Sequence, residues 1–250
     1  MSRYLVDGLM SLFFPADCLL CGKNLEPLNR SFICLDCWKK VKWLPSVCCV
    51  RCGRPLSFVS DKNLNYPSVC LDCRENPPHF KRLFSPTVYQ GVIAEAIKLF
   101  KYNGKRGIIR GFIQIIDASI NRFNLTSLGL EAIVPVPLHS TKLRERGFNQ
   151  AKELAKVISR YLNVPVWSDY LIRVRYTRPQ TKLRRKDREE NMKRAFSIRK
   201  GAKNRGKGKR ILLVDDVYTT GVTLNEASYE MKKDGAEVFS FTLARALEPQ

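Results

Sequence analysis

The clearest indication of the fold is the stretch Ile211-Leu-Leu-Val-Asp-Asp-Val-Tyr-Thr-Thr-Gly-Val-Thr223. Its first four residues form an unbroken apolar run, which is typical of a strand that is covered on both faces. Residues 222–233 are predicted to form a helix that stops at Gly235, a residue well suited to a helix end. The stretch therefore predicts a buried strand, a short polar loop and a helix in direct succession.

The polar residues of this stretch have the chemistry of an anion site. In open α/β sheets ligands bind beyond the carboxyl ends of the strands, where Asp215 and Asp216 are expected to emerge. Two adjacent carboxylates can accept hydrogen bonds from vicinal ribose hydroxyls or face Mg²⁺ on a sugar pyrophosphate. Residues 219–223 supply N–H groups and hydroxyls at a helix N-terminus, and Gly221 lets the backbone curl around a phosphate. The plainer alternative is a strand, turn and helix with a polar N-cap.

On the N-terminal side of this stretch, apolar patterns typical of strands alternate with patterns typical of helices. Such alternation indicates βαβ units and a mostly parallel sheet, so we expect an α/β fold. Asn149 is a plausible N-cap for a helix with an apolar stripe from Ala151 to Leu162. The other expected elements are strands over 82–89, 132–136 and 237–244 and helices over 91–102 and 107–123.

A cysteine-rich module precedes this alternating region. The chain has nine cysteines, all before residue 74, and eight of them form four Cys-x-x-Cys pairs. Two such pairs complete a tetrahedral four-thiolate site, so the spacing predicts two structural zinc ions. Reactive or disulfide-forming thiols are the alternative, and the pairs can combine in sequence or interleaved. Cys48 is left over: it could exchange with Cys49 as a ligand, and a buried or free thiol is the plainer alternative. The expected ligands are Cys18, Cys21, Cys34, Cys37, Cys49, Cys52, Cys70 and Cys73.

The chain is strongly basic. Its 250 residues include 44 Lys and Arg against 23 Asp and Glu, a net charge of +21 that favours polyanionic partners. Residues 171–210 alone hold 17 basic and 3 acidic residues. No apolar run reaches the roughly 18 residues that a membrane span needs. Residues 1–16 make a poor signal peptide, because Asp7 and Pro15 interrupt them. We therefore expect a cytoplasmic protein without a membrane span.

The quoted stretch resembles the 5-phosphoribosyl-1-pyrophosphate (PRPP) signature of type I phosphoribosyltransferases. Further motifs resemble the ComF family, in which a cysteine-rich zinc module precedes a phosphoribosyltransferase-like domain. The resemblance covers nearly the whole chain and implies a type I phosphoribosyltransferase sheet, with a zinc-ribbon module over 1–78 and the phosphoribosyltransferase-like domain over 79–250. Its motifs are Ile97-Lys-Leu-Phe-Lys101, Val134-Pro-Val-Pro-Leu-His139, Arg146-Gly-Phe-Asn-Gln150, Thr177-Arg-Pro-Gln180 and Arg188-x-x-Asn191 with Phe196.

The resemblance implies roles for individual residues. Asp215 and Asp216 would hold the ribose hydroxyls of PRPP–Mg²⁺, and the loop would hold its 5-phosphate. The loop residues implied are Thr219, Thr220, Gly221, Val222 and Thr223, and the residues implied to face the pyrophosphate are Lys142, Arg144 and Arg146.

One position departs from the purine-salvage enzymes of this fold, which place an aspartate base three residues beyond the acidic pair. Thr219 stands there, so a 6-oxopurine phosphoribosyltransferase is disfavoured. No glutaminase half is present, so amidotransfer from glutamine is disfavoured too. No catalytic residue is assigned.

The basic segment 182–194 has three interpretations. It resembles the mobile loop with which enzymes of this fold cover PRPP, it can track a nucleic-acid backbone, or it is a solvated charged face. Residues 199–210 carry basic residues and glycines without an acidic residue. They are a second candidate for DNA binding, and a flexible solubilising linker between strands is the plainer interpretation. The candidate side chains are Lys182, Arg184, Arg185, Lys186 and Arg188.

Two functions from different classes follow. The first is a PRPP-binding ComF-type protein that serves DNA uptake in natural competence, with single-stranded DNA and other DNA-uptake proteins as partners. The alternative is an active phosphoribosyltransferase that transfers phosphoribosyl from PRPP–Mg²⁺ to an amine or base and has no DNA role. The intact acidic pair and loop favour the enzyme, and the concentrated positive charge favours the DNA role.

Overall fold

The computed structural model describes residues 16–25, 32–56, 68–102, 105–175 and 194–247. Its centre is a parallel sheet of order β3–β9–β8–β5, with β4 continuing along β9. The strands are β3 (Leu83–Phe84), β4 (Thr87–Val88), β5 (Ala132–Pro135), β8 (Arg210–Tyr218) and β9 (Glu237–Arg245). The predicted mostly parallel α/β sheet is confirmed.

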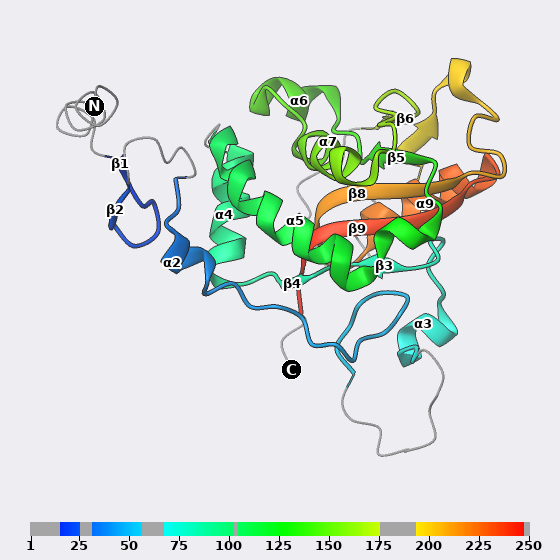
Figure 1. The fold of residues 1–250 in the computed structure, drawn as a ribbon. Coiled ribbons are helices and arrows are strands. Elements are labelled where there is room, and N and C mark those ends of the chain that lie inside the picture. Colours follow the sequence, from blue (N-terminus) through cyan, green and yellow to red (C-terminus); the bar gives the residue numbers. More distant parts are fainter. Residues whose placement is uncertain (1–15, 26–31, 57–67, 103–104, 176–193, 248–250) are drawn as a thin grey trace.

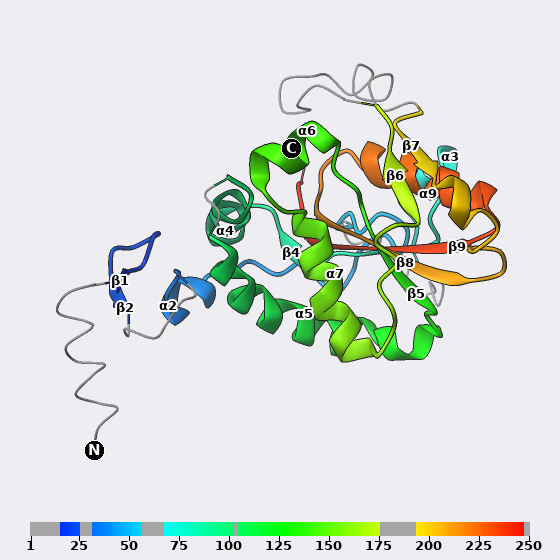
Figure 2. The ribbon, with the colours of Figure 1, turned by 90° about the horizontal axis from the view of Figure 1, so that it is seen from above.

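Helices cover both faces of this sheet (Figures 1 and 2). On one face α4 (Gly91–Tyr102), α5 (Ile109–Phe123) and α7 (Gln150–Leu162) pack in one apolar core with Leu212 and Val214. On the other, α9 (Val222–Lys233) and the hairpin of β6 (Leu171–Arg173) and β7 (Phe196–Ile198) share a second core with Ile211 and Leu213. The apolar run is therefore covered on both faces, as predicted.

Most of the expected elements are confirmed. The helices over 91–102 and 222–233 match to the residue. Asn149 caps α7, since its side-chain oxygen accepts the Ala151 N–H at 2.9 Å and the Lys152 N–H at 3.4 Å. The strand expected over 82–89 is instead two short strands, β3 and β4. The helix expected over 107–123 begins as a 3₁₀ turn over Arg106–Ile108.

Two regions differ from the sequence prediction. A short helix, α6 (Ser140–Arg146), forms where only a turn was expected. Residues 199–210 were interpreted as a flexible linker, and that interpretation is wrong. This segment forms an ordered series of turns that Asp234 fixes through hydrogen bonds. The Asp234 carboxylate accepts hydrogen bonds from the Asn204 N–H at 2.7 Å, the Gly206 N–H at 3.0 Å and the Tyr170 hydroxyl at 2.8 Å.

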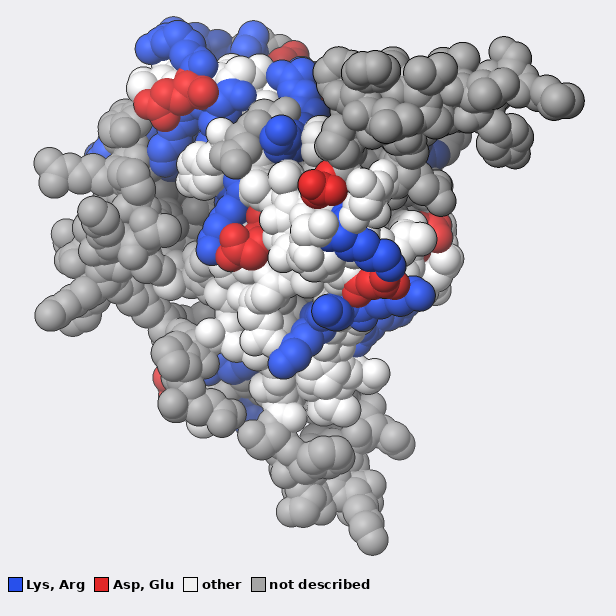
Figure 3. Space-filling model, turned by 90° about the vertical axis from the view of Figure 1, so that its left-hand side faces the viewer, with Lys and Arg blue, Asp and Glu red and all other residues white. Residues whose placement is uncertain are grey.

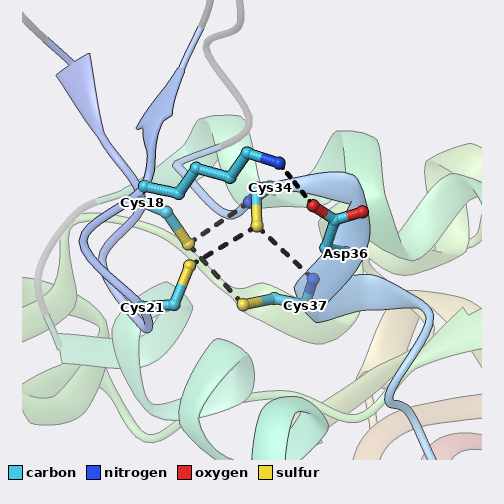
Figure 4. A network of polar contacts seen from close by, with 6 residues as sticks. Cys18, Cys21, Cys34, Asp36 and Cys37 are labelled. Atoms are coloured by element: carbon cyan, nitrogen blue, oxygen red, sulfur yellow. Dashed lines mark hydrogen bonds and ion pairs between the residues drawn. The ribbon is translucent and has the colours of Figure 1, made fainter.

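The cysteines form two clusters that pair in sequence order, so the interleaved alternative is excluded. The first cluster holds Cys18, Cys21, Cys34 and Cys37, and the second holds Cys49, Cys52, Cys70 and Cys73. Figure 4 shows the four sulfurs of the first cluster turned toward one another. Sulfur–sulfur distances are 3.8 Å for Cys18–Cys37, 3.6 Å for Cys21–Cys34 and 3.7 Å for Cys52–Cys70. A tetrahedron with Zn–S bonds of about 2.3 Å has edges of about 3.8 Å, so both clusters fit structural zinc.

The two ribbons share the same local structure. The first ribbon spans the described residues between Ala16 and Trp38, and the second spans those between Cys48 and Glu75. Each closes its first knuckle on a glycine in the left-handed region, at φ +71° for Gly22 and +69° for Gly53. In each ribbon the basic residue after this glycine forms a salt bridge with the aspartate of a Cys-Leu-Asp-Cys sequence. These salt bridges are Lys23–Asp36 at 2.6 Å and Arg54–Asp72 at 2.7 Å.

Each ribbon docks on a different core. Trp38, in α2 (Leu35–Trp38) of the first ribbon, contacts Phe112 edge-on at 5.7 Å and lies on Gly111 of α5, where a Cβ atom would overlap the indole. In the second ribbon, which includes α3 (Leu71–Glu75), the Cys52 carbonyl accepts a hydrogen bond from Arg245 of β9 at 2.6 Å. A domain boundary between residues 78 and 79 stays a prediction.

Among the described residues, no helix combines the length and apolar character needed to cross a bilayer.

We predict two zinc ions per chain in protein purified without added metal. Cys49→Ser removes a ligand of the second cluster and should lower the zinc content to about one, because three thiolates leave the tetrahedral site incomplete. Cys48→Ser is the matched control, since the Cys48 thiol lies outside both clusters and donates to the Pro45 carbonyl at 3.2 Å. Elemental analysis measures both. A parent content well under one zinc would contradict the prediction.

Candidate functional site

The predicted acidic pair lies inside β8, not beyond its end. β8 stays paired with β9 as far as Tyr218, opposite Arg245, so Asp215 and Asp216 are held within the ladder. Successive side chains of a strand point to opposite faces of the sheet. The two side chains leave the strand in opposite directions, but Lys101 of α4 remains close to both, since its charge acts on Asp215 as well as on Asp216.

Asp216 forms a buried ion pair with Lys101 of α4. The Lys101 Nζ lies 2.8 Å from Asp216 Oδ1, and the side chains are only 19% and 6% exposed. Burial alone would lower the pKa of Lys101, but the neighbouring carboxylates of Asp216 and Asp215 outweigh it, so the pKa is raised. Lys101 is thus held as a cation. The second carboxylate oxygen of Asp216 is buried without a hydrogen-bond partner among the described residues, which leaves an acceptor for a ligand.

Asp215 is half-buried on the other side of the strand. Burial and the charge of Asp216 raise its pKa to about 7, against the opposing effects of Lys101 and Arg173. Near neutral pH both its acid and its carboxylate forms are populated. The side chain can therefore accept a hydrogen bond from a ligand hydroxyl or donate one.

The loop after β8 leads into the N-terminus of α9. Gly221 is the N-cap of this helix, with φ +81°, and as a glycine it offers no side chain to cap the first N–H groups. A Cβ atom at Gly221 would collide with the ring and hydroxyl of Tyr218, so only glycine fits there. Thr219 is exposed, and the Thr220 hydroxyl is buried without a partner in the described part of the chain. The N–H groups at a helix N-terminus point out of the helix and form an anion-binding site.

Basic side chains from two elements face this site. Lys142 and Arg146 are four residues apart on α6 and lie on one face of that helix. Burial, followed by the charges of Arg173 and Arg146, lowers the pKa of Lys142. Burial also lowers the pKa of Arg173, on β6, where Asp215 has the opposite effect. Arg173 therefore interacts with Asp215, and Lys142 and Arg146 interact with Lys101, which pairs with Asp216.

The third predicted pyrophosphate residue lies apart from this group. Arg144 is exposed and, two residues from both Lys142 and Arg146, projects from the opposite side of α6. The predicted loop residues Lys182, Arg184, Arg185, Lys186 and Arg188 lie outside the described residues.

Sequence reasoning missed Lys101 and Arg173 as site residues. Lys101 ends a motif already noted, but its role depends on α4 ending beside β8. Arg173 comes from a hairpin that the sequence did not predict. Both become visible only when distant elements are brought together.

Arg245 links the second ribbon to Tyr218, the last residue of β8 before the loop. The Arg245 guanidinium lies 4.7 Å from the centre of the Tyr218 ring and donates to the carbonyl of Cys52, a cluster residue. Burial raises the pKa of Tyr218 to about 12, so its hydroxyl stays protonated beneath Gly221. A continuous set of contacts therefore joins the second cysteine cluster to the loop after β8.

Comparisons with known proteins agree with this architecture. Residues 9–74 match the double zinc ribbon domain, and residues 144–249 match the phosphoribosyl transferase domain. Competence protein F of Haemophilus influenzae is 34% identical over 240 residues, which cover 95% of this chain and all of the relative. DNA utilization protein YhgH of Salmonella typhimurium is 30% identical, over 90% of this chain and 94% of that protein. Competence protein ComFC of Bacillus subtilis is 30% identical, over 92% and 95%. The chain therefore belongs to the ComF family of competence proteins.

Proposed function

We propose that this protein binds PRPP–Mg²⁺ at the end of β8 and uses this site in handling DNA during natural competence. The observation that carries the proposal is the N-terminus of α9, with Gly221 as its N-cap, directly after a buried acidic pair and beside several cations. A phosphate needs N–H donors, vicinal hydroxyls need acceptors, and a pyrophosphate needs positive charge. The site offers all three within one group of elements.

Each part of PRPP has a candidate partner. The 5-phosphate would lie against residues 219–223, where helix N–H groups favour an anion. The ribose hydroxyls would meet Asp215 and Asp216, including the unpartnered oxygen of Asp216. The pyrophosphate would face Lys142 and Arg146. Mg²⁺ prefers carboxylate and phosphate oxygens, so it would arrive with the pyrophosphate and not in a protein cage of its own.

The DNA role rests on the relatives and on charge. Relatives over nearly the whole chain are named for competence and for DNA utilization. A net charge of +21 matches a polyanionic partner such as single-stranded DNA. We propose single-stranded DNA and other DNA-uptake proteins as partners.

The arrangement of cations favours a second candidate, phosphoribosyl transfer from PRPP to an amine or base. Fixed positive charge where a pyrophosphate departs stabilises the transition state of such a transfer. Lys142, Arg146 and Arg173 provide that charge. Release of pyrophosphate in the presence of candidate amines and bases would identify this activity.

Asp215→Asn with Asp216→Asn removes the carboxylates that accept the ribose hydroxyls. Affinity for PRPP–Mg²⁺ should fall by roughly tenfold or more, which is about 1.4 kcal/mol. PRPP–Mg²⁺ should raise the unfolding temperature of the parent protein and not of the double variant, because a ligand stabilises the state that it binds. Thermal denaturation with and without PRPP–Mg²⁺ measures this. Equal stabilisation of both proteins would mean that the ligand binds elsewhere.

Asp215 gives a pH dependence of stability. Its pKa is raised to about 7 from an ordinary value of 3.8, so between these values the folded protein holds a proton that the unfolded chain has lost. The stability contributed by this proton is complete below pH 3.8 and is lost as the pH rises toward 7. The free energy of unfolding of the parent, relative to Asp215→Asn, should therefore fall over this range. Urea denaturation at several pH values tests this, and a pH-independent difference would refute it.

The basic segment separates a DNA role from an enzyme loop. If Arg184, Arg185, Lys186 and Arg188 contact DNA phosphates, replacing all four by Ala should reduce the salt dependence of single-stranded DNA binding by about three units, at about 0.7 per contact. PRPP–Mg²⁺ affinity should change little, since the ribose and phosphate partners lie in 215–223. Binding titrations over a range of salt concentrations measure this. An unchanged slope with lost turnover would assign the segment to an enzyme loop.

A further inference from the structure

A cavity of about 180 Å³ lies between the first ribbon and α5, away from the acidic pair. Both its tryptophans, Trp38 and Trp43, come from the sequence Trp38-Lys-Lys-Val-Lys-Trp43. Trp38, Val41, Gly111 and Ile115 are buried lining residues, and Lys39 and Gln114 are exposed polar ones. An apolar cavity with aromatic walls and a few polar groups at its edge is suited to a flat, partly polar ring.

The two indoles are held in place before any ligand binds. Trp38 is fixed between Phe112 and Gly111. Trp43 is 43% exposed, but its backbone forms an antiparallel bridge with Thr87 of β4. Hydrogen bonds on either side anchor it, from the Val88 N–H to the Lys42 carbonyl at 2.9 Å and from the Leu44 N–H to the Pro86 carbonyl at 2.8 Å. Little conformational freedom of the backbone remains to be lost on binding.

The surroundings of the cavity are basic. Lys39, Lys40 and Lys42 are all exposed. No acidic residue occurs in the sequence between Asp36 and Asp61, and Asp36 is paired with Lys23 at 2.6 Å. Figure 3 shows that Lys and Arg side chains outnumber acidic ones on the side of the molecule that carries the first ribbon and α4. Lys39 lines the cavity, and Lys40 and Lys42 are its near neighbours in the sequence. An apolar cavity with such a basic edge is complementary to a ligand that is planar at one end and anionic at the other.

We propose that this cavity takes one unpaired base of single-stranded DNA, which stacks on Trp43 while Lys39, Lys40 and Lys42 contact the adjacent phosphates. Bases of duplex DNA are stacked inside the helix and cannot enter, so the site selects single strands. Stacking accepts any base, because every base has a flat face. The inference extends the DNA part of the proposed function and does not depend on PRPP.

Trp43→Ala tests the stacking step, with Tyr161→Ala of α7 as the matched control, since Tyr161 is an aromatic residue of similar exposure, 44%. The measurement is fluorescence anisotropy of a labelled oligothymidine with the full chain. Trp43→Ala should weaken binding by roughly 5- to 150-fold, the range for one base–aromatic stack, and leave the salt slope unchanged. Trp43→Phe should recover part of the affinity. An unfolding temperature and a zinc content equal to the parent's show that the variant is folded.

Replacing Lys39, Lys40 and Lys42 by Ala tests the phosphate contacts. The control is Lys152, Lys156 and Arg160 to Ala, which removes the same charge from exposed positions on α7. The first triple variant should flatten the salt slope by about two units and the control should not. A blunt duplex should bind without dependence on Trp43.

Three results would overturn this inference. The first is parent-like single-strand affinity in Trp43→Ala. The second is an equal loss in the Tyr161 control. The third is equal Trp43 dependence for the duplex. A parent protein that binds no oligothymidine at low salt would instead remove the whole DNA role, and this inference with it, while PRPP binding is judged separately.

Discussion

The pairing of β8 with strands on both sides is the constraint on which the rest of this structure depends. β8 is parallel to β5 on one side and to β9 on the other, and both its faces are covered by apolar cores. A strand so enclosed cannot slip by one residue without moving every side chain to the opposite face. The positions of Asp215, Asp216 and the loop that follows are thereby fixed.

This rigidity explains how charged groups are tolerated at the site. The Lys101–Asp216 pair is largely buried, and the loss of hydration offsets much of the attraction between such charges. Its place at the carboxyl edge of the sheet is better explained by ligand binding than by stability. Arg245 is a second buried cation, 6% exposed, which links Tyr218 to the Cys52 carbonyl. Formation of the second ribbon therefore supports the loop that begins after Tyr218, and this gives the zinc module a structural role in the site.

The sequence predicted those features that depend on neighbouring residues. Helices α4 and α9, the cap at Asn149 and the two cysteine clusters all follow from local spacing, and all are confirmed. Features that depend on distant contacts were missed. The acidic pair was expected beyond the strand, because its apolar run ends at Val214, but pairing with β9 extends β8 to Tyr218. Lys101 and Arg173 join the site through packing of α4 and of the β6–β7 hairpin, which no local pattern reveals.

A crystal structure of the protein with PRPP–Mg²⁺ would locate the ligand directly. We expect the 5-phosphate against the backbone N–H groups of residues 219–223 at the start of α9. We also expect the ribose hydroxyls on the acidic pair and the pyrophosphate toward Lys142 and Arg146. Density for PRPP on another surface, with the loop at Gly221 unliganded, would show that this site does not bind PRPP.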